Sequence, residues 1–503
     1  MRSAAAHDRR IAWRLACVVA LALSLLHRGH FMSTDELGMF FQTKSLAEEL
    51  SLAVPARVHM AFRGRDARSY SQYVVGQALI AAPLYSLGKA LTRGLGERAQ
   101  RTLAGPVGRS SWQGEPPVGA GAFSVLFYPA LVAGALAGVF FLFERRLGAS
   151  VSAALLASLA LAFCTHALLL GTLFLQHGAE ALLALAAFFF WHRYRGSGAA
   201  RDVLLGACCA AALFNVRAAA ALNGVALAGY LLFALAERAR AERDPARLAR
   251  ALGSAALPVA VSFGFYVAMN WLKWGSWLDS PQLEERSTLG ADPRAALYGF
   301  LLSPGMSVFV YSPPLLLAPF AFAPFWRRHR AEAIAVLALF LTTLAFYSTY
   351  ELWTGLFSCP GPRYLFTATV FLLLPLGPWL ERTRGLLARA SFAALAALGA
   401  GVELLSVGVN WGGLVIAGKW GAPFDFVFDW RAAPLFEAAR HALDPAYWDL
   451  WLARTALGWP GQPGQPALAA ALFGLWAVGF AWLALRLRAA LREARAAHSA
   501  PSA

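Results

Sequence analysis

Two adjacent carboxylates, Asp35 and Glu36, follow the first apolar segment of the chain within the stretch HFMSTDELGMFF. A carboxylate close to a membrane surface can take a proton from a hydroxyl group, orient a cation or accept a hydrogen bond from a sugar. The same letters also indicate a helix start, because Ser33 or Thr34 followed by Glu36 is typical of a capping box. The two interpretations are compatible, since a capped helix would hold both carboxylates at a fixed height near the bilayer.

Other polar side chains are expected at the same ends of the apolar segments. His177 and Glu180 lie three residues apart, so one helix face could present them to a divalent cation together with Glu36, or they could pair at a helix end. Arg217 stands within apolar sequence, where a cation needs a turn or a partner. Arg363, in PGPRY, is either an anchor at the interface or a clamp on a phosphate.

Glu351, in the stretch YELW, is expected at an outer segment end as well and could contact sugar hydroxyl groups. The five cysteines lie in apolar runs or alone in a loop, so they indicate neither a disulfide framework nor a metal cluster.

The composition indicates which solvent these groups meet. Apolar residues make up 58% of the 503 residues and charged residues 14%, and the mean hydropathy is +0.53, so the bilayer is the expected solvent. The net charge of +16 resides in short arginine runs between apolar segments. Such runs indicate membrane orientation and contact with anionic lipid headgroups rather than nucleic-acid binding.

The sequence therefore predicts an all-α, polytopic membrane protein with about twelve transmembrane helices. These are expected near residues 12–27, 121–143, 150–169, 176–192, 203–217, 219–236, 251–270, 306–325, 333–350, 364–380, 385–409 and 467–485. Residues 74–92 contain Pro83 and Lys89 and are expected to lie on the interface instead of crossing it.

On this topology the arginine-rich connections and both termini face the cytoplasm. The transmembrane core spans residues 1–409 and includes a first outer loop at 28–120. A tryptophan-rich outer loop follows at 410–466, and residues 467–503 form the last span and a basic tail.

Three further motifs follow the acidic pair: RSYSQYVVGQALIAAPLYSLG, LLSPGMSVFVYSPP and GPRYL. This order resembles membrane glycosyltransferases of the GT-C type, in the family 39-like group that includes protein O-mannosyltransferases and the lipid A aminoarabinose transferase. The resemblance implies a sugar donor carried on polyprenyl phosphate and transfer at the periplasmic face of a bacterial inner membrane.

By the same resemblance, Asp35 would be the catalytic base and Glu36 a helper or cation ligand. Tyr70 and Tyr73 would belong to the substrate-binding patch, with Arg363 and Arg217 on the donor side. Gln72 stands where that patch usually has lysine, which removes a possible phosphate contact.

The residues and the resemblance together predict a glycosyltransferase acting on a periplasmic lipid, glycan or protein, with membrane lipids as partners and at most a divalent cation as cofactor. No P-loop, Rossmann glycine fingerprint or His-Cys zinc spacing occurs. The alternative is a transporter or flippase for a lipid or solute, which would place polar residues in mid-span and show two related halves. A non-catalytic export or scaffold component is a further alternative, in which Asp35 would be dispensable.

Overall fold

The computed structural model describes residues 2–58, 60–94, 120–281, 289–355, 359–410, 425–459 and 462–499. Within these ranges the chain is a bundle of helices, accompanied by two small two-stranded sheets. The predicted all-α membrane fold is confirmed. Residues 95–119 of the predicted first loop and residues 411–424 of the predicted tryptophan-rich loop lie outside the described residues.

The helices of the bundle are largely apolar but differ widely in length. They are α1 (Arg2–Leu25), α6 (Tyr128–Arg146), α7 (Val151–Phe163), α8 (Ala167–Leu170), α9 (His177–Ser197), α10 (Ala200–Val216), α11 (Ala221–Glu242), α12 (Pro245–Trp274), α14 (Pro293–Leu302), α15 (Val308–Tyr311), α16 (Ala318–Arg328), α17 (Arg330–Thr349), α18 (Phe366–Leu372), α19 (Leu376–Arg382), α20 (Leu386–Gly408) and α25 (Pro466–Ser499).

Seven helical stretches of the described chain are long and apolar enough to cross a membrane: 121–146, 218–242, 245–274, 330–349, 363–382, 386–408 and 466–494. The other predicted spans are helical but shorter, more polar or interrupted. The predicted span 306–325 is divided into α15, the 3₁₀ helix η3 (Pro313–Leu317) and α16. Pro313 and Pro314 explain the division, because proline lacks the N–H that continues an α-helix.

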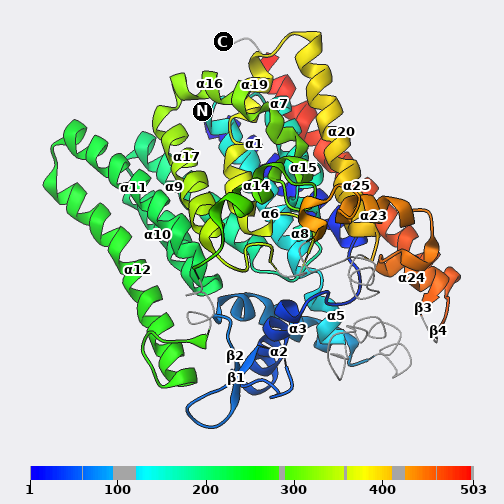
Figure 1. The fold of residues 1–503 in the computed structure, drawn as a ribbon. Helices are drawn as coiled ribbons and strands as arrows, with labels where there is room; N and C mark the ends of the chain where they lie inside the picture. Colours follow the sequence, from blue (N-terminus) through cyan, green and yellow to red (C-terminus); the bar gives the residue numbers. More distant parts are fainter. Residues whose placement is uncertain are drawn as a thin grey trace.

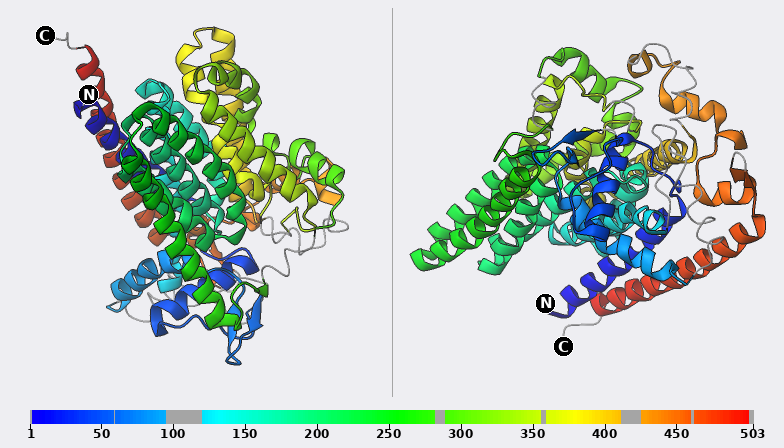
Figure 2. Two further views of the ribbon diagram at one scale, coloured as in Figure 1. Left: turned by 90° about the vertical axis from the view of Figure 1, so that its left-hand side faces the viewer. Right: turned by 90° about the horizontal axis from the view of Figure 1, so that it is seen from below.

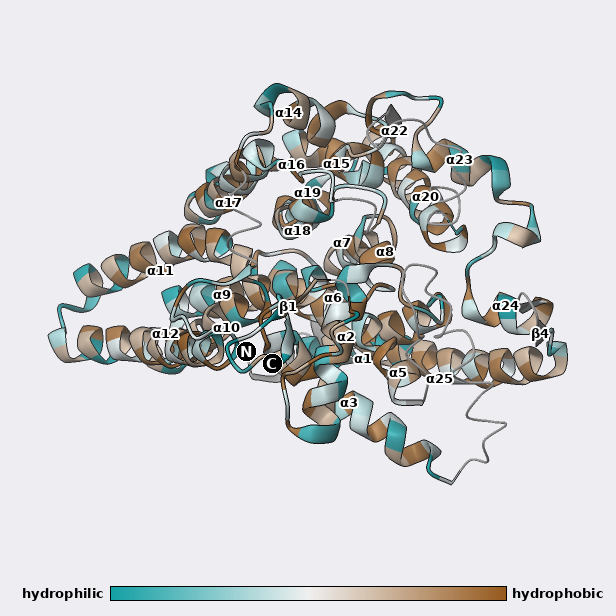
Figure 3. Cartoon of the chain, turned by 60° about the horizontal axis from the view of Figure 1, so that its bottom comes forward, coloured by the Kyte–Doolittle hydropathy of each residue, from teal (hydrophilic) through white to brown (hydrophobic). Residues whose placement is uncertain are grey.

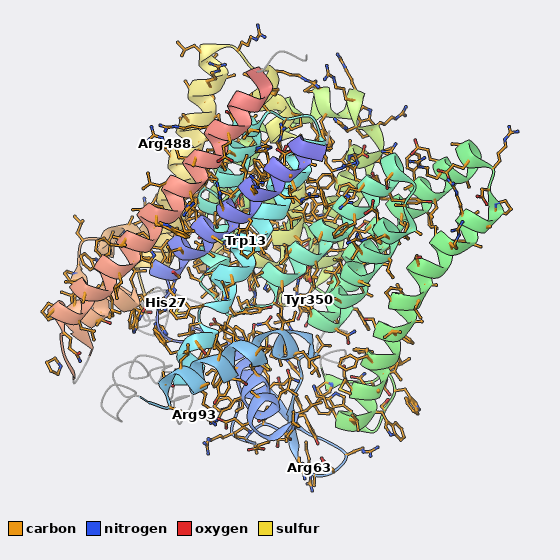
Figure 4. All side chains as sticks on the ribbon, turned by 180° about the vertical axis from the view of Figure 1, so that it is seen from behind. Trp13, His27, Arg63, Arg93, Tyr350 and Arg488 are labelled. Carbon is orange, nitrogen blue, oxygen red and sulfur yellow. The ribbon has the colours of Figure 1, made fainter. Side chains whose placement is uncertain are left out.

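The two ends of the bundle carry different parts of the chain. In Figure 1 both termini lie at the end that also carries α16 and α19, whereas the first loop lies at the opposite end. We call these the terminal end and the loop end. Figure 4 shows the same division from behind, with Arg63 and Arg93 at the loop end and Arg488 toward the terminal end.

The loop end contains α2 (Thr34–Glu49), α3 (Gly76–Thr92) and α5 (Ala120–Val125), with the hairpin β1 (Ala61–Arg63) and β2 (Ser69–Ser71). The strands are antiparallel, with Phe62 opposite Tyr70. Helix α3 corresponds to the predicted interfacial segment and lies beside α2, beyond the bundle (Figure 1). The later segments are α22 (Asp425–Phe428), α23 (Pro434–His441), η5 (Pro445–Tyr447), α24 (Trp451–Leu457) and the strands β3 (Gly458–Trp459) and β4 (Gln462–Pro463).

Close backbone contact holds α1 against α6. A Cβ atom at Gly134 would lie 2.3 Å from the carbonyl oxygen of Ala16, and one at Gly138 would lie 3.0 Å from that of Ala12. Small residues four apart allow such contact between membrane helices, where the hydrophobic effect does not drive helices together. Figure 2 shows α25 running along the outer side of α1.

Helices α12 and α25 form the outer surface of the bundle. Almost none of the apolar stretch of either helix is buried, and Figure 3 shows hydrophobic residues along both. In a membrane-spanning chain these faces meet lipid acyl chains.

Candidate active site

The start of α2 positions the acidic pair, and Glu36 holds that start in place. Ser33 and Glu36 form the predicted capping box: the Ser33 hydroxyl accepts from the Glu36 backbone N–H, and the Glu36 carboxylate accepts from Ser33 N at 3.0 Å. The carboxylate also accepts from the backbone N–H groups of Met32 and Phe174, both at 2.6 Å. Burial raises the pKa of Glu36, and these backbone N–H groups oppose that rise. Glu36 therefore fastens α2 to the segment before α9.

Asp35 turns away from this cap and joins two groups from distant parts of the chain. Its Oδ2 lies 2.8 Å from Nη1 of Arg363, and its Oδ1 accepts a hydrogen bond of 2.6 Å from the Tyr73 hydroxyl. The side chains of Arg363 and Asp35 are only 7% and 18% exposed. Burial, followed by the neighbouring Asp35 carboxylate, raises the pKa of Tyr73, so this phenol remains a proton donor.

Arg363 begins the short 3₁₀ helix η4 (Arg363–Leu365), which leads into α18. Its Nη2 donates to the Tyr364 hydroxyl at 3.3 Å, and the guanidinium lies 5.0 Å from the centre of that ring. Its Nε is buried and has no hydrogen-bond partner among the described residues. Gly355, with a φ of +72°, packs so closely that a Cβ there would lie 2.7 Å from Nε. The guanidinium is thus confined, and its Nε–H is a buried donor without a described partner.

A buried ion pair lies beside this site. Arg217 follows α10, and its Nη1 contacts Glu180 of α9 at 2.6 Å; both side chains are 3% exposed. Its Nη2 donates to the Tyr347 hydroxyl at 2.8 Å. Glu180 also accepts from Asn223 at 2.6 Å and Thr367 at 3.2 Å. The sequence prediction that Arg217 needs a turn or a partner is confirmed on both counts.

Two stacked tyrosines connect the ion pair to Arg363. The rings of Tyr347 and Tyr364 are parallel, with centroids 4.6 Å apart. The guanidinium of Arg217 lies 5.4 Å from the Tyr364 ring, and the ring of His177 lies 6.0 Å from it. Arg217, His177 and Arg363 therefore surround one aromatic pair.

The predicted divalent cation has no matching ligand set in the part of the chain that the structure describes. No group of three His, Cys, Asp or Glu side chains there is placed to hold a metal ion. The carboxylate of Glu36 accepts from backbone N–H groups, and that of Glu180 binds Arg217. These residues do not fit a metal centre.

Two other predicted site residues lie apart from Asp35. Tyr70 belongs to β2, donates to Asp66 at 2.8 Å and packs against the ring of Trp274. Glu351 is exposed in the turn after α17, near Gly290. The described contacts join neither of them to Asp35 or Arg363.

No sequence pattern singles out Lys273, which in the structure contacts the backbone of residues 71–73. Its ammonium is buried at the end of α12 and donates to the carbonyl oxygens of Ser71 at 2.5 Å and Tyr73 at 2.9 Å. It thereby holds the backbone that presents Tyr73 to Asp35. Arg28 and His30 were missed too: they bind Asp449 at 2.6 and 2.7 Å and tie the end of α1 to the segment before α24. A basic residue at the end of an apolar run is ordinarily an interface anchor, so no local signal distinguished these three.

The fold and site together define a multi-pass helical membrane protein with a buried carboxylate–guanidinium pair at one end of its bundle. No family model and no curated protein matches the chain. Among solved structures it is similar to ArnT from Cupriavidus metallidurans bound to undecaprenyl phosphate, at 15% identity and a TM-score of 0.48, over 95% of this chain and 76% of that one.

It is also similar to the oligosaccharyltransferase AglB from Archaeoglobus fulgidus, at 12% identity and a TM-score of 0.42. That match covers 78% of this chain and 56% of that one. Both proteins belong to the GT-C group that the order of sequence motifs resembles.

Proposed function

We propose that this chain is a membrane glycosyltransferase that moves a sugar from polyprenyl phosphate to an acceptor hydroxyl group. The observation that carries the proposal is the contact of 2.8 Å between Asp35 and Arg363, buried at the loop end of the bundle. A carboxylate can accept the proton of a hydroxyl group, and a guanidinium can bind phosphate through two parallel hydrogen bonds. Both groups are needed at one place when the leaving group is a lipid phosphate.

Arg363 is the proposed donor-phosphate ligand. Its Nη1 contacts Asp35, while its buried Nε lacks a described partner. A phosphate whose oxygens accept from Nη1 and Nη2 would occupy the end edge of the guanidinium and release Oδ2 of Asp35. The stacked ring of Tyr364 keeps the guanidinium plane in place during this exchange.

Asp35 is the proposed base. The oxygen of the acceptor hydroxyl forms a bond to the anomeric carbon of the sugar while the bond from that carbon to the phosphate oxygen breaks. The hydroxyl proton passes to Asp35, and polyprenyl phosphate leaves with the electron pair of the broken bond. Tyr73 keeps the carboxylate oriented throughout through its bond to Oδ1.

The proposed orientation places the loop end in the periplasm of a bacterial cell and both termini in the cytoplasm. The arginine-rich connections expected at the terminal end support this orientation. The exposed apolar faces of the bundle offer lipid contact to an isoprenoid chain.

The test uses the full chain in vesicles with a labelled sugar on polyprenyl phosphate and membrane extract as the source of acceptor. Asp35→Asn should lower transfer by about 10²–10⁴-fold, the usual contribution of a general base. Asp66→Asn is the matched control, because Asp66 lies in the same loop and also accepts from a tyrosine hydroxyl, yet contacts neither Asp35 nor Arg363 in the described structure. Normal transfer by correctly folded Asp35→Asn protein would refute the proposal.

The same vesicles test the alternative function. A transporter or flippase would move the labelled lipid between leaflets without forming a glycosylated product. In that case neither the unmodified chain nor Asp35→Asn would form any product. Product that depends on Asp35 therefore separates the two functions.

A further inference from the structure

A basic cavity lies at the terminal end of the bundle, on the opposite side from Asp35. It has a volume of about 350 Å³. Its lining residues come from the last turns of two helices: Ala323, Pro324, Arg327, Arg328 and Arg382. Figure 1 shows these helices, α16 and α19, side by side at that end. The cavity is large enough for a small polar ligand.

The three arginines carry charge that the described residues do not neutralise. No ion pair within 4.0 Å involves any of them in the described part of the chain. The neighbouring carboxylate of Glu381 accepts from the backbone of Ser150 at 3.0 Å instead. The C-terminal ends of α16 and α19 each contribute about half a negative charge, so three positive charges become about two. The cavity therefore favours an anion.

The position of the cavity indicates where that anion comes from. The apolar stretch 363–382 ends at Arg382, so the cavity lies at the depth where lipid headgroups meet a membrane helix. Large apolar side chains on α16 and at the start of α20 are exposed: Phe320 is 67% exposed, Leu386 84% and Leu387 82%. A ligand that fits these surroundings has an anionic head and an apolar body.

We propose that this cavity binds the phosphate headgroup of an anionic phospholipid. Arginine pairs with phosphate oxygens in a planar fork, and basic cavities between membrane helices suit such headgroups. The acyl chains then lie along the exposed apolar residues of α16 and α20. This site is separate from the proposed donor site, and it does not depend on the glycosyltransferase proposal.

The test measures lipid binding to the purified full chain by native mass spectrometry and by its thermal unfolding midpoint. Added phosphatidylglycerol should bind and raise the midpoint, whereas phosphatidylcholine should not. The variant R327Q/R328Q/R382Q should need at least about tenfold more phosphatidylglycerol for the same effect. The control R240Q/R243Q/R250Q removes the same charge from exposed positions around the α11–α12 turn and should bind as the unmodified protein does.

Three outcomes would overturn the proposal. They are unchanged binding by R327Q/R328Q/R382Q, an equal loss in R240Q/R243Q/R250Q, and an equal rise of the midpoint with inorganic phosphate alone. The last would show a site for soluble anions instead of a lipid. If the triple variant does not fold, the single variants R328Q and R382Q are measured, and each should weaken lipid binding.

Discussion

Replacing Arg217 by methionine tests the buried pair that supports the candidate active site. The substitution removes a charged contact to Glu180 of 2.6 Å and a bond to the Tyr347 hydroxyl of 2.8 Å. Hydrogen bonds to charged groups contribute roughly 1.5–3 kcal/mol each. Glu180 would keep its bonds from Asn223 and Thr367 but would remain as a buried charge without a cation.

We therefore expect Arg217→Met to lower the free energy of unfolding by about 3–5 kcal/mol, the usual cost of breaking a buried pair from one side. The variant E180Q/R217M removes both charges and should lose much less than the two single variants added together. Their coupling energy should be about 1–3 kcal/mol. Unfolding is followed in mixed micelles of increasing SDS content by the fluorescence of the 17 tryptophans.

The matched control is Arg238→Met on α11. Arg238 also binds a glutamate, Glu242, at 3.0 Å, but this pair is about one-fifth exposed and four residues apart on one helix. Such a pair contributes about 0.3–0.5 kcal/mol. Two results together would refute the reasoning: a loss below about 1 kcal/mol in the free energy of unfolding for Arg217→Met, and additive losses in E180Q/R217M. They would show that the Arg217–Glu180 pair is hydrated.

Three further predictions follow from other contacts. Glu36→Gln should lower the free energy of unfolding by about 1–2 kcal/mol, measured by unfolding in SDS. Three backbone N–H groups donate to the Glu36 carboxylate, and an amide offers them only one acceptor oxygen. Gly355→Ala should strain the backbone by about 1–2 kcal/mol and displace Arg363, so the KM for the lipid-linked donor should rise in the transfer assay. Burial lowers the pKa of His30, but the Asp449 carboxylate outweighs it and raises the pKa above 6.5 overall. The stability from His30 is therefore fully present below pH 6.5 and is lost as the pH rises through the raised value, and the thermal midpoint of His30→Gln should vary less with pH between 6 and 9.

Local signals in the chain were sufficient for the helices and for some of their ends. Ser33 and Glu36 predicted the capping box of α2, and the bonds between them are present. The spacing of His177 and Glu180 predicted one helix face, and both residues lie in the first turn of α9. A helix cap and a helix face involve only neighbouring residues, so hydropathy and spacing are enough to identify them.

Hydropathy and residue spacing do not show which side chains pair with one another across the fold. Glu180 was expected beside His177 or a cation, yet it binds Arg217, 37 residues further along. The sequence predicts Glu36 as a helper of Asp35 or a cation ligand; in the structure its oxygens accept from backbone N–H groups just before α2 and from that of Phe174, before α9. Lys273 and Tyr73 are 200 residues apart, and no pattern within either segment indicates the other.

Hydropathy and capping residues are enough to identify this chain as a helical membrane protein, to locate most of its helices and to place Asp35 in the first turn of a capped helix near a membrane boundary. Apolar runs and capping residues act over one or two helical turns, so their consequences are readable locally. The contact of Asp35 with Arg363, 328 residues away, and the hydrogen bond from Tyr73 to the same carboxylate become visible only in the folded chain. That contact depends on which helices pack together and at what height, and the packing of the whole bundle sets both.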